Sequence, residues 1–286
     1  MESLKGKVAL VTGASRGIGK GVARWLGKEG MTVYVTGRTV ASGQSAFPGT
    51  VGETAEEVTQ GGGKGVAVAV DHANDEQVAA LFERIRRDEG RLDILVNNAT
   101  ALPDDLIVPK PFWEKPLSNW EVIDVGVRSH FVAAWHAAQI MVPQNSGLIV
   151  AISGYVGVAY NYGVLFGVGK AASDRMARDM AIELKPHNVA SISLWQGLTF
   201  TEKALANMAS KAKDMGSHFS NAANGCTPDY QGMVIAALAK DPAIMRRSGG
   251  TFISAEVGRE YGITDLDGNQ PVSLRDTVAA PIWEPV

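Results

Sequence analysis

A glycine-rich segment close to the start of the chain has the residue types and spacing of a phosphate-binding turn. Residues 12–19 read TGASRGIG and follow an apolar, strand-like run at 8–11. Gly13 would allow the tight turn, Gly17 would let the backbone approach a pyrophosphate, and Gly19 would let the next helix pack closely. Exposed amides and the helix dipole would then favour an anion. We therefore expect a dinucleotide cradle here; the alternative is an ordinary turn between a strand and a helix.

A cation follows the second strand-like run, at the place where an acidic side chain would favour NAD. That run covers 32–36 and is followed by Gly37, Arg38 and Thr39. An acidic residue at the glycine position would accept hydrogen bonds from both ribose hydroxyls of NAD. Arg38 and Arg16 could instead pair with a 2′-phosphate. The sequence therefore favours NADP(H) over NAD(H); the alternative is that Arg38 is a solvated loop residue.

Alternating strand-like and helical patterns would hold these segments in place. Strands are expected at 8–11, 32–36, 66–70, 92–96, 147–152, 189–194 and 250–254. Helices are expected at 17–28, 52–60, 75–88, 118–142, 166–184 and within 202–240, with a proline-rich loop at 101–116. Continuous rather than alternating apolar strands indicate an α/β fold, a three-layer Rossmann fold with a doubly wound parallel sheet of about seven strands. We expect one domain over 1–286, with ligands at the carboxyl ends of the strands.

Composition excludes several classes of protein. The chain has 286 residues, 45% of them hydrophobic, and a net charge of −3, which gives no bulk electrostatic support for nucleic-acid binding. Its single cysteine, Cys226, excludes a disulfide framework and a multi-cysteine metal site, and we expect no metal. Apolar runs are too short for a membrane span, and residues 1–7 lack the apolar core of a signal peptide. We expect a cytoplasmic protein.

Four motifs together resemble the short-chain dehydrogenases/reductases. They are the TGxxxGxG form of the glycine-rich segment, the triplet Asn97-Asn98-Ala99, the lysine at 170, and Gly197 with Thr201. Thr100 departs from the family in replacing a glycine, and Gln196 in replacing a proline. The resemblance runs from about residue 5 to 255, and the tail at 260–268 resembles one subgroup of the family.

The resemblance assigns most of the cofactor-binding residues. They are Gly13, Ser15, Arg16, Gly17, Ile18, Gly19, Arg38, Thr39, Asp71, His72, Asn98, Ala99, Lys170, Gly197 and Thr201. It implies that Asp71 contacts the adenine ring, although a plain helix-starting acid is the alternative. Asn97 could be largely structural, bonding backbone across adjacent strands.

The catalytic positions depart from the family pattern. Members use a tyrosine as proton donor, a lysine that lowers its pKa, a serine that positions the substrate carbonyl, and an asparagine that supports a water relay. Lys170 is present, but Phe166 stands at the tyrosine position, Gly154 at the serine position and Gly126 at the asparagine position. A one-residue shift would give the serine role to Ser153. The resemblance therefore implies cofactor binding without the usual alcohol–ketone chemistry.

Three tyrosines could replace the missing proton donor. Tyr155, Tyr160 and Tyr162 precede the helix at 166–184, and Tyr162 is the preferred substitute because it lies nearest to that helix. The alternative is that they line an apolar substrate pocket. Trp113 and Trp120 are expected to be packing anchors.

The leading hypothesis is an NADP(H)-dependent oxidoreductase that acts on a small, largely apolar substrate. Reduction of an imine or an activated C=C bond fits, because positioning for hydride transfer supplies most of that catalysis. One alternative is a carbonyl reductase that uses Tyr162 or Ser153. Another is a non-catalytic NADP(H)-binding sensor or scaffold.

The resemblance also implies that copies of the chain associate into an oligomer. Family members form homodimers or homotetramers through two long helices, here the patterns at 118–142 and 166–184. Residues 201–224 would form a lid over the substrate. Residues 255–286 would form a C-terminal extension.

Overall fold

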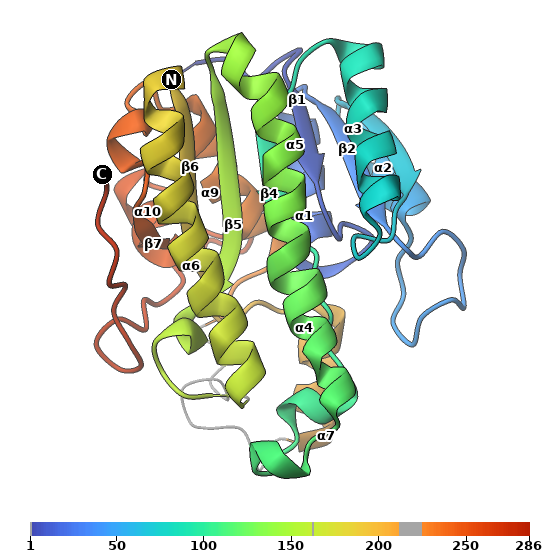
Figure 1. The fold of residues 1–286 in the computed structure, drawn as a ribbon, viewed down its shortest axis with the longest axis vertical. Coiled ribbons are helices and arrows are strands. Elements are labelled where there is room, and N and C mark those ends of the chain that lie inside the picture. Colours follow the sequence, from blue (N-terminus) through green and yellow to red (C-terminus); the bar gives the residue numbers. More distant parts are fainter. Residues whose placement is uncertain (1, 162, 212–224) are drawn as a thin grey trace.

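A parallel sheet forms the centre of the molecule (Figure 1). The structure, a computed structural model, describes residues 2–161, 163–211 and 225–286. Within these residues the sheet has seven strands in the order β3-β2-β1-β4-β5-β6-β7, and every pair is parallel. The strands are β1 Val8–Val11, β2 Thr32–Gly37, β3 Lys64–Ala69, β4 Ile94–Asn97, β5 Gly147–Gly154, β6 Val189–Gln196 and β7 Thr251–Ile253. The predicted fold class is confirmed.

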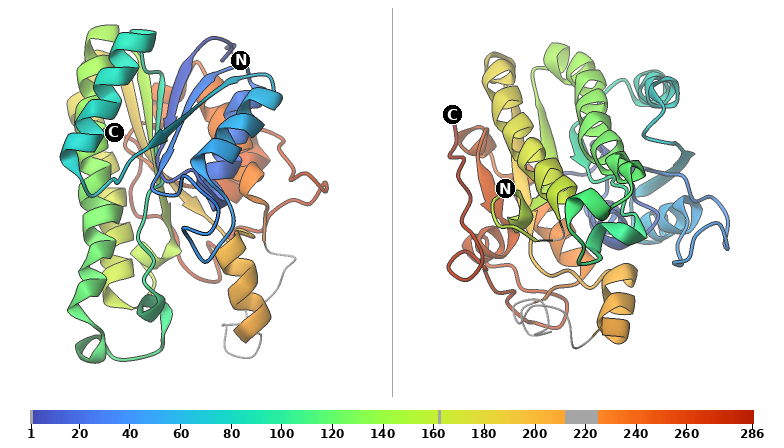
Figure 2. Two further views of the ribbon diagram at one scale, coloured as in Figure 1. Left: turned by 90° about the vertical axis from the view of Figure 1, so that its right-hand side faces the viewer. Right: turned by 60° about the horizontal axis from the view of Figure 1, so that its bottom comes forward.

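Helices cover both faces of this sheet, as the turned views show (Figure 2). One face carries α1 Gly17–Lys28, α2 Val51–Gln60 and α9 Pro228–Lys240. The other face carries α3 Asp75–Glu89, α5 Ser129–Gln144 and α6 Val164–Leu184. Further α-helices are α4 Glu121–Ile123, α7 Glu202–Lys211 and α10 Ser254–Glu260.

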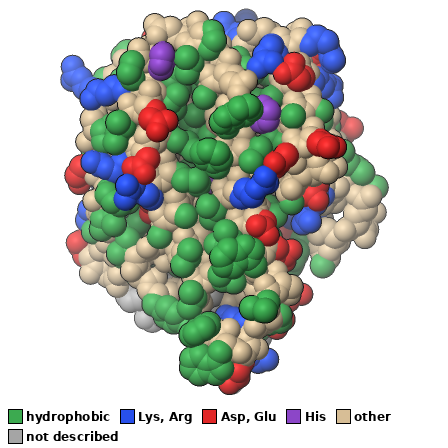
Figure 3. Space-filling model, in the orientation of Figure 1, with side chains coloured by type: hydrophobic (Ala, Val, Ile, Leu, Met, Phe, Trp, Pro, Cys, Tyr) green, Lys and Arg blue, Asp and Glu red, His purple; other side chains and the backbone are tan. Residues whose placement is uncertain are grey.

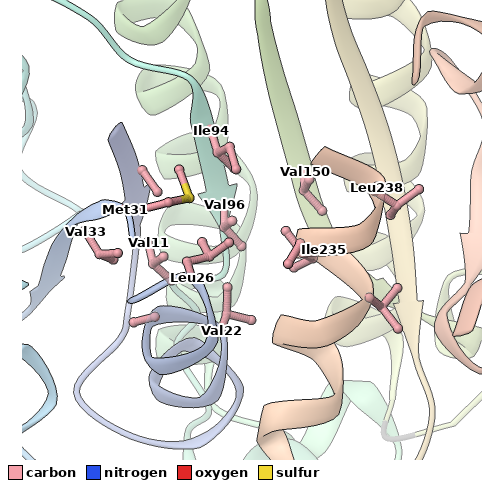
Figure 4. Close-up of a cluster of buried hydrophobic side chains, with 14 of the residues drawn as sticks. Val11, Val22, Leu26, Met31, Val33, Ile94, Val96, Val150, Ile235 and Leu238 are labelled. Carbon is pink, nitrogen blue, oxygen red and sulfur yellow. The ribbon is translucent and has the colours of Figure 1, made fainter. Parts of the chain in front are cut away.

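Side chains from successive strand positions enter opposite layers of the core. In β1, Ala9 and Val11 pack with α1, α2 and α9, whereas Val8 and Leu10 pack with α3 and α5. Figure 4 shows the first of these layers around Val11. Because both faces are buried, β1 is apolar throughout, which explains why its sequence does not alternate.

The segment between β4 and α5 is more structured than its sequence predicts. Residues 101–116 include short 3₁₀ helices at Asp104–Ile107 and Phe112–Glu114, where a loop was expected. The expected helix at 118–142 begins as a 3₁₀ turn and α4, then passes through one π-helical turn at Asp124–Arg128 before α5. The prediction that Trp113 and Trp120 are packing anchors is wrong, because their side chains are 73% and 56% exposed. No helix among the described residues could span a membrane.

The C-terminal extension lies along the outer side of β7. The Thr251 N–H donates to the Trp283 carbonyl at 2.9 Å, and the Val286 N–H donates to the Ser248 carbonyl at 2.9 Å. Two guanidinium groups of α6, from Arg175 and Arg178, lie 5.5 and 5.3 Å from the Trp283 ring. These contacts fix the end of the chain against the sheet and α6.

Candidate active site

A cavity of about 630 Å³ opens at the carboxyl ends of the strands. It lies where the strand order reverses between β1 and β4, the position at which open α/β sheets bind ligands. Its size suits a dinucleotide with a small substrate. Most predicted site residues line it: Gly13, Ser15, Arg16, Gly17, Ile18, Arg38, Thr39, Asp71, His72, Asn98, Ala99, Gly154, Phe166, Lys170, Gly197 and Thr201.

Close packing explains why glycine is needed at two positions of the cradle. Gly13 has φ +65°, and a Cβ there would lie 2.7 Å from Ala99 Cα. A Cβ on Gly19 would lie 2.5 Å from Asn98 Nδ2, the atom that donates to the carbonyls of Thr12 and Gly13 at 2.8 and 2.9 Å. Gly19 therefore makes room for Asn98 and does not line the cavity.

Thr12 joins the cradle to the loop after β4, and sequence reasoning did not single it out. Its hydroxyl oxygen accepts hydrogen bonds from the backbone N–H groups of Asn98 and Ala99 at 2.9 and 3.0 Å. Asn97, expected to be structural, donates from Nδ2 to the His130 carbonyl at 3.0 Å. The two loops at the switch point therefore form one rigid floor.

The two arginines that line the cavity next to the β2–α2 loop, Arg16 and Arg38, make different contacts. Arg16 donates from Nε to the Pro48 carbonyl at 3.0 Å and from Nη2 to the Gly49 carbonyl at 2.8 Å. Its guanidinium thus holds the β2–α2 loop while it lines the cavity, and its pairing with a 2′-phosphate stays a prediction. Arg38 is exposed, lines the cavity, and forms no hydrogen bond or ion pair with the described residues.

His72 is held neutral in the wall beside Arg38. The Thr36 hydroxyl donates to the Val11 carbonyl at 3.3 Å, so its oxygen is free to accept from His72 Nε2 at 2.8 Å. Burial lowers the pKa of His72 to about 4. The neighbouring Asp71 carboxylate accepts from the Ala73 N–H at 3.0 Å, which closes the turn before α3.

The other end of the cavity surrounds Lys170. Its ammonium donates to the Ile152 carbonyl at 2.8 Å and lies 5.7 Å from the centroid of the Phe166 ring. Burial lowers the pKa of Lys170 to about 8, and the carboxylate of Asp174 opposes that shift. Gly154 has an extended backbone with φ −176°, and no atom lies within 4 Å of where its Cβ would be.

Ser153 lies behind the cavity rather than in it. Its side chain is fully buried, and its hydroxyl donates to the Lys170 carbonyl at 3.2 Å. The one-residue shift that would give Ser153 the catalytic role is therefore wrong, because consecutive residues of a strand face opposite sides. The same buried layer holds Asp174, which accepts from Ser193 Oγ at 2.6 Å and from Trp195 Nε1 at 2.9 Å.

The tyrosines before α6 are placed differently. Tyr155 lines the cavity with its ring, but its hydroxyl accepts from the Leu274 N–H at 3.0 Å, and burial raises its pKa to about 12. Tyr160 is 83% exposed and does not line the cavity. The preferred substitute, Tyr162, lies outside the described residues.

Most of the chain matches a known protein family. The family model of short chain dehydrogenases matches residues 7–212. The chain belongs to the short-chain dehydrogenase/reductase family. Its members bind nicotinamide cofactors, and the chain is an oxidoreductase of this type.

Relatives of this short-chain dehydrogenase/reductase cover almost its full length. Dehydrogenase/reductase SDR family member 1 of Mus musculus is 42% identical over 276 residues, 93% of this chain and 85% of the relative, which confirms the predicted subgroup. A short-chain dehydrogenase/reductase of Serratia marcescens has a TM-score of 0.72 and 27% identity, covering 88% of this chain and 97% of its own. A metagenomic short-chain oxidoreductase in complex with NADP has a TM-score of 0.66 and 26% identity, covering 84% and 93%.

The cradle of this short-chain dehydrogenase/reductase suits a dinucleotide, and three positions differ from the pattern that the resemblance implies. Gly13 and Gly17 both have positive φ and line the cavity, and the N-terminus of α1 faces it. Phe166 stands in the cavity at the predicted tyrosine position, and open space surrounds the Cβ position of Gly154, the predicted serine position. Gly126 falls in the π-helical turn, and a Cβ there would lie 3.5 Å from Thr100 Oγ1.

Proposed function

We propose that the chain is an NADP(H)-dependent oxidoreductase that reduces an imine or an activated C=C bond in a small, largely apolar substrate. The supporting observation is Phe166 beside Lys170 in a cavity that keeps its cofactor cradle. Among the described residues that line this cavity, Tyr155 is the one tyrosine, and its hydroxyl is bound to the Leu274 N–H. A hydride acceptor that needs no proton from a tyrosine fits this arrangement better than a ketone does.

The side chains around Lys170 can bind such a substrate and exclude water. Phe166, Val156 and Leu198 give apolar walls, and the space at Gly154 can accept substrate bulk where a serine would contact a carbonyl. Bound NADPH would supply the hydride. Lys170, held by the Ile152 carbonyl, would bind the cofactor's ribose, and its positive charge would stabilise the enolate that forms when a hydride adds to an enone. An imine takes its proton from solvent to become an iminium, whose carbon is already electrophilic, and the enolate formed from an enone takes its proton from water after hydride transfer. Holding the acceptor in position then supplies most of the catalysis.

Arg38 supports the choice of NADP(H). Its guanidinium borders the cavity and is available to pair with a 2′-phosphate, whereas Arg16 is engaged with the β2–α2 loop. Arg38→Ala should weaken NADPH binding about 10- to 100-fold, because a charge-assisted pair is lost, and should leave NADH binding unchanged. Arg87→Ala, at an exposed position of α3, is the matched control. Equal losses for both cofactors would contradict the assignment.

A turnover panel with NADPH tests the reaction class. We expect measurable reduction of a cyclic imine or an enone and very slow reduction of matched ketones. Tyr162→Phe should leave that turnover unchanged. Loss of turnover in this variant would instead support a carbonyl reductase that uses Tyr162 as its proton donor. Tight NADPH binding with no turnover of any acceptor would contradict the proposed reaction and support a non-catalytic NADP(H)-binding module.

We further propose that two copies of the chain associate through α5 and α6. Figure 3 shows hydrophobic side chains gathered over the face that these helices form. Phe131 and Trp135 of α5 and Val168 and Ile182 of α6 are each about half exposed on their helices. Family members are generally oligomeric, and a second copy is the partner that would cover this face.

A further inference from the structure

The N-terminus of α1 is capped by a carboxylate from a distant part of the chain. Arg16, at the N-cap position, makes no capping hydrogen bond with its side chain, and the first turn holds no acidic residue. Instead, the Gly17 N–H donates to Glu202 Oε2 at 3.0 Å. Glu202 is the first residue of α7, and its carboxylate also interacts electrostatically with the Arg16 guanidinium.

Neighbouring contacts fix this carboxylate over the cradle. Thr201 Cγ2 lies 3.3 Å from where a Cβ on Gly17 would be, so the start of α7 packs directly on the glycine-rich turn. On the opposite side, Lys203 Nζ donates to the Leu102 carbonyl at 2.7 Å and lies 3.6 Å from Asp104 Oδ1. The start of α7 therefore bridges the loops after β1 and β4, across the mouth of the cavity.

Glu202 thus uses the same donor that a dinucleotide needs. The N–H groups at a helix N-terminus bind phosphate oxygens, and the helix dipole favours any anion there. One N–H cannot donate fully to a carboxylate and a phosphate together, and the two anions repel each other at that distance. Binding of the pyrophosphate and binding of the Glu202 carboxylate are therefore mutually exclusive.

We propose that Glu202 is an internal competitor for the pyrophosphate group of the cofactor. This contact holds the start of α7 on the cradle, and a dinucleotide binds by displacing the carboxylate from the Gly17 N–H. This inference rests on the proposed binding of NADP(H). It explains why an acidic side chain lines a cradle whose ligand is an anion.

Binding measurements on Glu202→Gln test the competition. The variant keeps the shape of the side chain but loses the charge, so we expect NADPH and inorganic pyrophosphate to bind about tenfold more tightly than to the unmodified chain. Adenosine 2′-monophosphate, which has no pyrophosphate, should bind with unchanged affinity. Glu56→Gln removes one negative charge from an exposed position of α2 and should change none of the three affinities.

A second readout separates competition from a purely structural cap. Without ligand, Glu202→Gln should unfold at a slightly lower temperature, because α1 loses a charged cap. Saturating NADPH should then raise its unfolding temperature by more than it raises that of the unmodified chain. Glu202→Asp keeps the charge on a side chain one methylene shorter, and should give an intermediate gain in affinity.

The outcomes are distinguishable. Weaker or unchanged NADPH binding by Glu202→Gln would overturn the inference, and weaker binding would show that Glu202 holds the cofactor. An equal gain for adenosine 2′-monophosphate would also overturn it, because the effect would then be general electrostatics. If the unmodified chain and all variants bound neither NADPH nor pyrophosphate, the proposed function would fail, and this inference with it.

Discussion

Introducing a serine and a tyrosine into the cavity should give the protein ketone reductase activity. The perturbation is Gly154→Ser combined with Phe166→Tyr. Gly154 has an extended backbone and open space at its Cβ position, so a serine fits without strain. The Phe166 ring centroid lies 5.7 Å from Lys170 Nζ. A unit charge at that distance favours a phenolate by about 3 kcal/mol at an effective dielectric constant of about 20, or about a hundredfold in its ionisation.

The expected gain follows from general acid catalysis. A positioned proton donor contributes roughly 10²- to 10⁴-fold, so the double variant should reduce a small apolar ketone at least about a hundred times faster than the unmodified chain. NADPH consumption measures this rate, and imine reduction in the same assay should change little. Phe131→Tyr adds the same hydroxyl to a half-exposed ring on α5 and should give no gain. A double variant that binds NADPH normally but gains less than about threefold in ketone turnover would refute the reasoning.

Two further predictions concern stability and assembly. Burial lowers the pKa of His130 to about 3 from 6.5, so below pH 6.5 the unfolded chain binds a proton there that the folded chain does not. The free energy of unfolding should therefore fall by up to about 5 kcal/mol between pH 6.5 and 3. Denaturant titrations should show a shallower decline for His130→Asn, with the contribution of His72 remaining. A decline equal to that of the unmodified chain would contradict the assignment. Trp135→Asp should lower the mass of the protein in solution, measured by light scattering, to that of one chain. The control Val40→Asp, in the exposed β2–α2 loop, should leave the mass unchanged. An unchanged mass for Trp135→Asp would exclude α5 from the interface between copies.

Local signals made most of the fold predictable from the sequence. Strands buried on both faces are short apolar runs, and each is separated from the next by a helical pattern, so the order of elements could be inferred. The π-helical turn at Asp124–Arg128 could not, because the apolar pattern at 118–142 runs through it without a break. Exposure of Trp113 was also unpredictable, since a tryptophan in a loop packs inward or faces solvent according to its distant neighbours.

The site was predictable where its residues act through their own backbone. Gly13 and Gly17 are recognisable because tight turns need glycine, and their neighbours in sequence define the turn. The role of Arg16 depends on where the β2–α2 loop places its carbonyls at Pro48 and Gly49, which no local pattern encodes. Glu202 reaches the cradle across 185 positions of sequence, so the contact could be found only in three dimensions.

Residues 283–286 protect one edge of the sheet from pairing with other chains. An edge strand with unpaired backbone groups is a template on which other chains can add strands and aggregate. The Trp283 carbonyl accepts from the Thr251 N–H of β7, the Val286 N–H donates to the Ser248 carbonyl just before β7, and the two α6 arginines beside the Trp283 ring hold this segment in place. At the opposite edge, β3, the Gly65 N–H donates to the Thr59 hydroxyl of α2 at 3.1 Å, and Lys64 forms an ion pair with Glu89. Both borders of the sheet therefore have backbone groups that are already bonded within the chain, which leaves fewer of them for pairing with another molecule.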